Sequence, residues 1–117
     1  MMPEEFVDFS QRFEVGFLAW IINAKPTMGR TDFTITREKI RIEPQEYDPL
    51  RLPSTGSKVT LIFANPYYTE RCEMGIVKGT LKRDSAGLEI EPLDITWSLA
   101  FDLERHPDRI VKRWKRK

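Results

Sequence analysis

Val15-Gly16-Phe17-Leu18-Ala19-Trp20-Ile21-Ile22 is the longest apolar run in this sequence of 117 residues. The run is continuous, short, and rich in β-branched and aromatic residues, which is typical of a strand buried within a β-sheet. It is also far too short to cross a bilayer as a helix. The sequence therefore predicts a β-protein with this strand in its core and with no membrane segment.

A short helix is expected before this strand. Pro3 suits the first turn of a helix, and the carboxylates of Glu4 and Glu5 favour the positive end of the helix dipole. Apolar residues then recur at helical spacing. The pattern predicts a helix over residues 3–12 with one apolar face.

The segment after the strand begins with a predicted loop over residues 23–29, which have the composition of a turn. Residues 31–36 and 39–43 then alternate apolar and polar side chains, which predicts two strands joined by a tight hairpin. Residues 44–57 contain three prolines and form an irregular connection.

The second half of the chain reads as further strands. Residues 59–64 are a strongly predicted strand, and residues 73–82 alternate well. Gly75 and Gly79 lie within that alternating segment and indicate a bulge or bend. A polar turn precedes residues 88–91, which are expected to pair back as a hairpin.

The C-terminal part is ambiguous in sequence. Residues 93–103 alternate as a strand does, whereas Ile110, Val111 and Trp114 share a helical face. A short C-terminal helix is therefore expected, with an extended terminal strand as the alternative.

These elements predict one domain over residues 1–117: a mainly β, small antiparallel barrel of about six strands with an N-terminal helix. The length suits a single core. Six apolar residues in the predicted strands are expected to lie buried in that core: Phe17, Leu18, Trp20, Ile62, Ile76 and Trp97.

Composition excludes several kinds of site. The 19 basic residues nearly balance the 18 acidic ones, which argues against a generic nucleic-acid binder. With Cys72 and His106 as the single cysteine and histidine, no intrachain disulfide and no metal site are expected. The acidic N-terminus is unlike a targeting segment, so a cytoplasmic location is expected.

Three pieces of the sequence follow one another in a familiar order. A helix leads into Gly16-Phe17-Leu18-Ala19, Lys58 opens the strand at 59–64, and Ile76-Val77-Lys78-Gly79-Thr80-Leu81 precedes a polar turn. Together they resemble the pyridoxamine-phosphate-oxidase-like, FMN-binding split-barrel family over about residues 3–97. The resemblance implies a split barrel that binds FMN, a flavin-dependent oxidoreductase acting on a small molecule, and a homodimer with the flavin at the subunit boundary.

The resemblance also implies which residues hold the cofactor. A phosphate dianion is bound well by guanidinium, ammonium and hydroxyl donors. The matching positions are Arg30, Thr31, Arg51, Thr55, Ser57 and Lys58. No catalytic side chain is implied, because the flavin itself carries the hydride chemistry. Tyr67 and Tyr68 are expected to rim the cofactor or seal a subunit contact.

The alternative is a small barrel without flavin that acts as a binding module for nucleic acid or for a protein. The basic C-terminal residues would make that contact, with Trp114 either stacking on a base or docking on the barrel. The residues concerned are Lys112, Arg113, Trp114, Lys115, Arg116 and Lys117.

Overall fold

The computed structural model of the chain describes residues 1–44, 53–65, 71–101 and 110–117. The expectations for Arg51, Tyr67, Tyr68, His106 and the side chain of Cys72 lie outside what it describes. The elements are α1 (Glu4–Ser10), β1 (Val15–Ile22), β2 (Lys25–Ile35), β3 (Ile40–Pro44), β4 (Lys58–Asn65), β5 (Arg71–Asp84), β6 (Gly87–Phe101) and β7 (Ile110–Lys115). Among these residues no helix is long and apolar enough to cross a bilayer.

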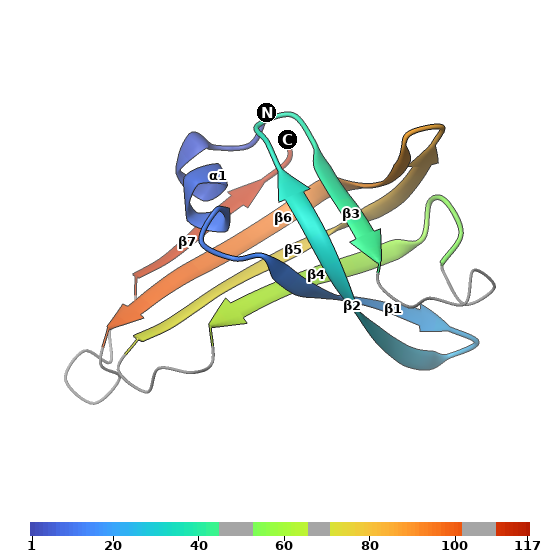
Figure 1. Cartoon of the computed structure of the whole chain (residues 1–117), viewed down its shortest axis with the longest axis horizontal. Helices are drawn as coiled ribbons and strands as arrows, with labels where there is room; N and C mark the ends of the chain where they lie inside the picture. Colours follow the sequence, from blue (N-terminus) through green and yellow to red (C-terminus); the bar gives the residue numbers. More distant parts are fainter. Residues whose placement is uncertain (45–52, 66–70, 102–109) are drawn as a thin grey trace.

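Six of the strands close into an antiparallel barrel, which confirms the predicted fold class. The strand order is β3-β2-β1-β4-β5-β6, and β3 also pairs with β6 to complete the ring (Figure 1). β7 pairs with β6 beyond the part that β3 uses, since Ile40 lies opposite Ile90 but Val111 lies opposite Ser98. One edge of the long strand β6 is thus shared by two different strands.

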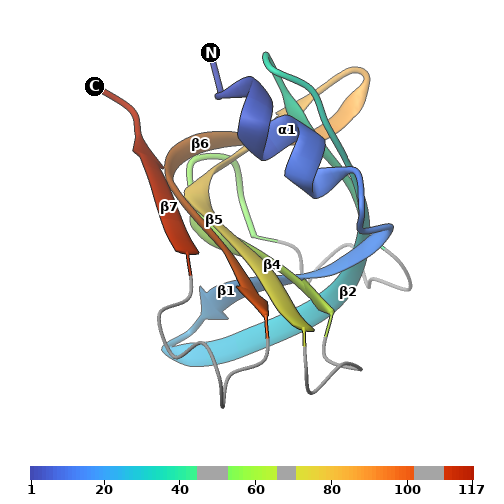
Figure 2. The same cartoon turned by 90° about the vertical axis from the view of Figure 1, so that its left-hand side faces the viewer.

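The core is centred on the ring of Phe63. Its centroid lies 5.0 Å from those of Phe13 and Phe33 and 6.2 Å from those of Phe6 and Phe9. Phe6 and Phe9 come from α1, which lies across the upper end of the barrel in Figure 2. Burial of this aromatic face holds the helix in place, because seven residues are too few for a helix to be stable alone.

β1 has one buried and one exposed face. Leu18 and Trp20 are buried as predicted, and so is Trp97 on β6. Phe17 is 47% exposed, so its predicted burial is wrong. Ile62 and Ile76 are half-buried on the same outer side as Phe17. The cause is the antiparallel barrel, in which alternate side chains of every strand point away from the core.

The loop predicted over residues 23–29 is wrong, because β2 already begins at Lys25. Ile22 pairs with Lys25, and the two residues between them form a tight turn. Asn23 and Ala24 have φ values of 49° and 63°, which is the left-handed geometry of a type I′ hairpin. Asn is usual in such a turn, but Ala is not, and Ala24 concealed the turn from the sequence pattern.

Replacing Ala24 with glycine is expected to stabilise the protein by about 0.5–1 kcal/mol. The left-handed region strains an alanine, and the relief of that strain exceeds the added chain entropy of glycine. Thermal or urea unfolding measures the change. Ala86→Gly, in the β5–β6 turn at a residue whose own φ is not positive, is the matched control and should be slightly destabilising. Equal effects at the two sites would contradict this account.

The bulge expected from the glycines of β5 is present at Gly79. The register between β5 and β6 shifts there, with Lys78 opposite Asp94 and Gly79 opposite Pro92. A Cβ on Gly79 would lie 2.2 Å from the carbonyl oxygen of Glu91, so only glycine fits. The bulge lets β6 continue as one strand where the sequence predicted two segments.

The C-terminal segment is the strand β7, so the expectation of a helix is wrong and the extended alternative is correct. Trp114 is half-buried and packs on the core. Arg113 donates to both carboxylate oxygens of Asp94, at 2.7 and 3.1 Å, and these hydrogen bonds lower the pKa of Asp94. Two further ion pairs join Lys112 to Glu5 and Arg116 to Glu91.

Candidate functional site

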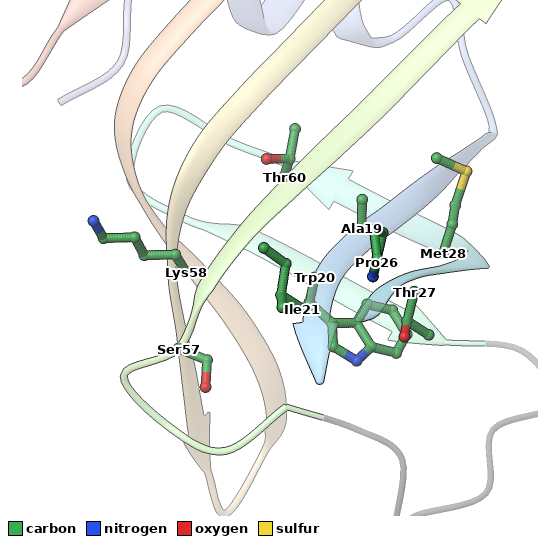
Figure 3. Close-up of a pocket in the computed structure, with 9 residues that line it drawn as sticks. All are labelled: Ala19, Trp20, Ile21, Pro26, Thr27, Met28, Ser57, Lys58 and Thr60. Atoms are coloured by element: carbon green, nitrogen blue, oxygen red, sulfur yellow. The ribbon is translucent and has the colours of Figure 1, made fainter. Parts of the chain in front are cut away.

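A pocket of about 540 Å³ lies on the outer side of the barrel where β1, β2 and the start of β4 meet. Figure 3 shows Ser57 and Lys58 at one side of this pocket and Met28 at the other. Its lining residues are Ala19, Trp20, Ile21, Pro26, Thr27, Met28, Ser57, Lys58 and Thr60.

Two tight turns position the pocket. The hairpin at residues 23–24 folds β2 back on β1, so that Ala19 lies opposite Met28 and Ile21 opposite Pro26. The turn at residues 54–57 is held to β5, because Gly56 donates its N–H to the carbonyl of Leu81 at 2.8 Å. Leu81 in turn donates to the carbonyl of Ser57 at 2.9 Å, which fixes the approach to β4.

The chemistry of the pocket is mainly apolar with a few polar groups at one side. Ile21 and Met28 are 71% and 60% exposed, so they present apolar surface directly to a ligand. Among the lining residues that the structure describes, Lys58 is the only ionisable side chain, and the Ser57 and Thr60 hydroxyls lie on the same strand and its approach. Pockets of this size and composition are typical of sites for drug-sized organic ligands.

The structure places some of the predicted cofactor residues at the pocket and others away from it. Ser57 and Lys58 line the pocket, whereas Thr55 is exposed in the preceding turn and does not. Arg30 is exposed on the outer face opposite Phe17. Thr31 is fully buried, and its hydroxyl donates to the carbonyl of Asp32 at 2.8 Å. Contact of Arg30, Thr31 or Thr55 with a cofactor stays a prediction, as it does for Arg51.

The sequence missed the apolar wall of the pocket. Ala19 and Ile21 were assigned to a strand buried on both faces, and Pro26 and Met28 to a loop. No alternation of apolar and polar residues marks the outer face of β1, because the whole run from Val15 to Ile22 is apolar. The unusual turn at Ala24 concealed the part of the apolar wall that β2 forms.

The geometry offers no side-chain acid, base or metal site in the part of the chain that is described. No group of three or more His, Cys, Asp or Glu side chains there is arranged to hold a metal ion. In the basic C-terminal segment, Lys112, Arg113 and Arg116 pair with carboxylates of the barrel and helix. These three cations are therefore partly neutralised and less available to phosphate groups of a nucleic acid. The nucleic-acid alternative itself stays untested.

Comparison with known protein families and with curated proteins finds no sequence match. Comparison with solved structures does find a match, the FAD binding protein from Mycobacterium smegmatis. The two structures superpose with a TM-score of 0.68 at 14% sequence identity, over 86% of this chain and 98% of that one. At this identity the likeness establishes that the two chains share a fold.

Proposed function

We propose that this protein binds a flavin, specifically FMN, in the pocket between β1, β2 and β4. The observation that carries the proposal is the pocket itself, with an apolar wall opposite Lys58 and Ser57. FMN has a similar division between a planar aromatic ring system and a phosphate. The shared fold with an FAD binding protein supports a flavin, and the resemblance to the pyridoxamine-phosphate-oxidase-like family supports FMN.

In this assignment the chain supplies binding and orientation. Lys58 and the hydroxyl of Ser57 would hold the phosphate, while Ile21, Met28 and the ring of Trp20 would contact the isoalloxazine. A bound flavin supplies hydride or electron transfer, which makes a flavin-dependent oxidoreductase of a small molecule the proposed activity. Of the described lining residues only Lys58 could exchange a proton, so these pocket walls would chiefly exclude water. The proposal includes a cytoplasmic location.

The proposed assembly is a homodimer that uses the outer face beside the pocket. Phe17, Ile62 and Ile76 lie side by side on β1, β4 and β5 and form what we call the outer apolar strip. Phe17 leaves nearly half of its surface exposed, and the exposed Ile21 and Met28 adjoin the strip. A second copy on this face would bury these side chains and wall the pocket, since symmetric dimers commonly cover such patches.

Substituting Lys58 tests the cofactor assignment. In Lys58→Met the affinity for FMN should fall about ten- to hundredfold, because a charge-assisted contact with phosphate is lost. The affinity for riboflavin, which lacks the phosphate, should stay the same. Quenching of flavin fluorescence measures both.

The matched control is Lys39→Met, an exposed lysine in the turn between β2 and β3 that is remote from the pocket lining. It should leave both affinities unchanged. Wild-type protein that quenches neither FMN nor riboflavin at high micromolar concentration would refute the proposed function.

A further inference from the structure

The outer face of the barrel carries more positive than negative charge. Cross-strand pairing arranges this face into two rows of residues that run from β2 to β7. The first row is Arg30, Phe17, Ile62, Ile76, Thr96 and Arg113. The second row is Met28, Ala19, Thr60, Lys78, Asp94 and Lys115. The two rows hold four cations and a single carboxylate.

That carboxylate is already engaged. Arg113 donates two hydrogen bonds to Asp94, and the charges of Lys115 and Lys78 also lower the pKa of Asp94. Asp94 therefore offsets part of the charge of Arg113, Lys78 and Lys115, but it is one carboxylate against four cations.

Four cations of this face have no bonded partner among the described residues. Arg30, Lys58, Lys78 and Lys115 are exposed, and they form no hydrogen bond or ion pair there. We call these four residues the cationic rim. Lys58 of the pocket belongs to it, two residues along β4 from Thr60, which pairs with Lys78. Strand geometry places the Cα atoms of Lys58 and Lys78 about 8 Å apart, so charge bound at the pocket acts most strongly on these two members of the rim.

A two-fold interface on this face brings like charges together. In a symmetric dimer the same patch serves both subunits, so each cationic rim meets its own copy. The outer apolar strip attracts, whereas the two rims repel over distances comparable to the Debye length, about 10 Å at 0.1 M salt. The balance between the attraction of the two strips and the repulsion of the two rims therefore depends on anions at the interface.

We propose that an anionic ligand in the pocket controls assembly, by neutralising the cationic rim and so allowing two outer apolar strips to meet. The inference rests on the proposed flavin site and names its regulation. A phosphate monoester carries a charge of about −1.5 to −2 near neutral pH. One bound at Lys58 in each subunit would remove much of the repulsion. FMN thus promotes dimerisation, and riboflavin, with the same ring and no phosphate, does so far less.

Sedimentation velocity of the full chain tests this inference, with flavin binding followed by absorbance in the same cell. Without ligand, the dimer should become about tenfold tighter or more between 20 and 300 mM NaCl, because salt screens the repulsion. At 20 mM NaCl, saturating FMN should tighten the dimer by a similar factor, and saturating riboflavin should tighten it far less. Inorganic phosphate, added at the same concentration as FMN, is the control that distinguishes the effect of free phosphate from that of a phosphate anchored by the flavin ring.

A charge variant outside the pocket tests the same repulsion without ligand. Lys78→Gln should strengthen the ligand-free dimer at 20 mM NaCl about threefold and flatten its salt dependence. Lys39→Gln removes an equal charge from the β2–β3 turn and should change neither quantity. Both lysines are exposed, so neither substitution is expected to affect folding.

The outcomes separate the two proposals. If FMN binds but the dimer tightens equally with riboflavin, or loosens with salt, charge control of assembly is refuted and the flavin site stands. If no flavin binds, the proposed function fails, while a ligand-free dimer that tightens with salt would still support repulsion between the rims. A monomer that binds a single-stranded oligonucleotide on this face, with steep loss of affinity in salt, would overturn the inference in favour of a nucleic-acid module.

Discussion

Replacing Phe63 with alanine should destabilise the protein by about 3–5 kcal/mol, among the largest single effects on its stability. Phe63 is 1% exposed, and its ring contacts aromatic rings from α1, from β2 and from the α1–β1 connection. Truncation leaves a cavity that none of these rings can fill without moving the helix. Urea unfolding measures the loss. The control is Leu93→Ala in the exposed bulge of β6, which should cost less than about 0.5 kcal/mol.

Gly75 lies against Phe63, so the contact between them can be tested with a double-mutant cycle. A Cβ on Gly75 would lie 2.3 Å from the ring of Phe63, so Gly75→Ala should be strongly destabilising in the wild-type protein. In Phe63→Ala the added methyl group has space, and there it should cost little or even stabilise. The expected coupling is in the upper part of the range of about 0.5–3 kcal/mol for residues in contact. Additive effects would show that the two residues are not in contact.

Phe17→Glu is the second large effect, and it acts on assembly. Phe17 is the aromatic residue of the outer apolar strip and is 47% exposed, and a carboxylate buried there in a dimer would be poorly solvated. We expect the dimer dissociation constant to rise about hundredfold, corresponding to about 2.7 kcal/mol. Flavin affinity should fall with it, because the partner subunit would no longer wall the pocket. Light scattering and flavin titration measure the two changes.

The fold of the variant should survive, since residue 17 points outward and is exposed in the single subunit. Ser85→Glu at the tip of the β5–β6 turn adds the same charge away from the strip and serves as the control. A Phe17→Glu protein with unchanged molar mass would mean that the outer apolar strip is not the subunit contact.

The periodicity of apolar residues along the sequence predicted the barrel and half of the residues that were expected in its core. Leu18 and Trp97 lie inward as expected, because large apolar residues in strands of a small barrel have few other places to go. Phe17 was misplaced because an uninterrupted apolar run has the same appearance whether it is buried on two faces or on one face with an apolar outer surface. Only the neighbouring strands decide between these cases, and their register is not a local property of the sequence.

The position of the candidate site depends on register in the same way. Ser57 and Lys58 were named because the resemblance places phosphate-binding donors in the segment before β4, and the structure has a pocket beside that segment. Thr31 has an equally suitable hydroxyl, but the period of two along β2 turns it into the barrel. A shift of one residue along β2 decides whether a threonine faces a ligand or the core. Because the turn at Ala24 was predicted as part of a loop, the start of β2, from which the alternation is counted, was not known from the sequence.

The division of one β6 edge between β3 and β7 has a consequence for aggregation. Where β3 leaves β6, the remaining edge from Asp94 to Leu99 would be a row of unpaired peptide groups, the kind of edge that recruits strands from other chains. β7 covers this row and replaces it with a new outer edge that carries Lys112, Arg113 and Lys115. Repeated positive charge on an edge strand disfavours the addition of another strand. We therefore expect β7 to disfavour edge-to-edge association of barrels, whatever ligand the pocket holds.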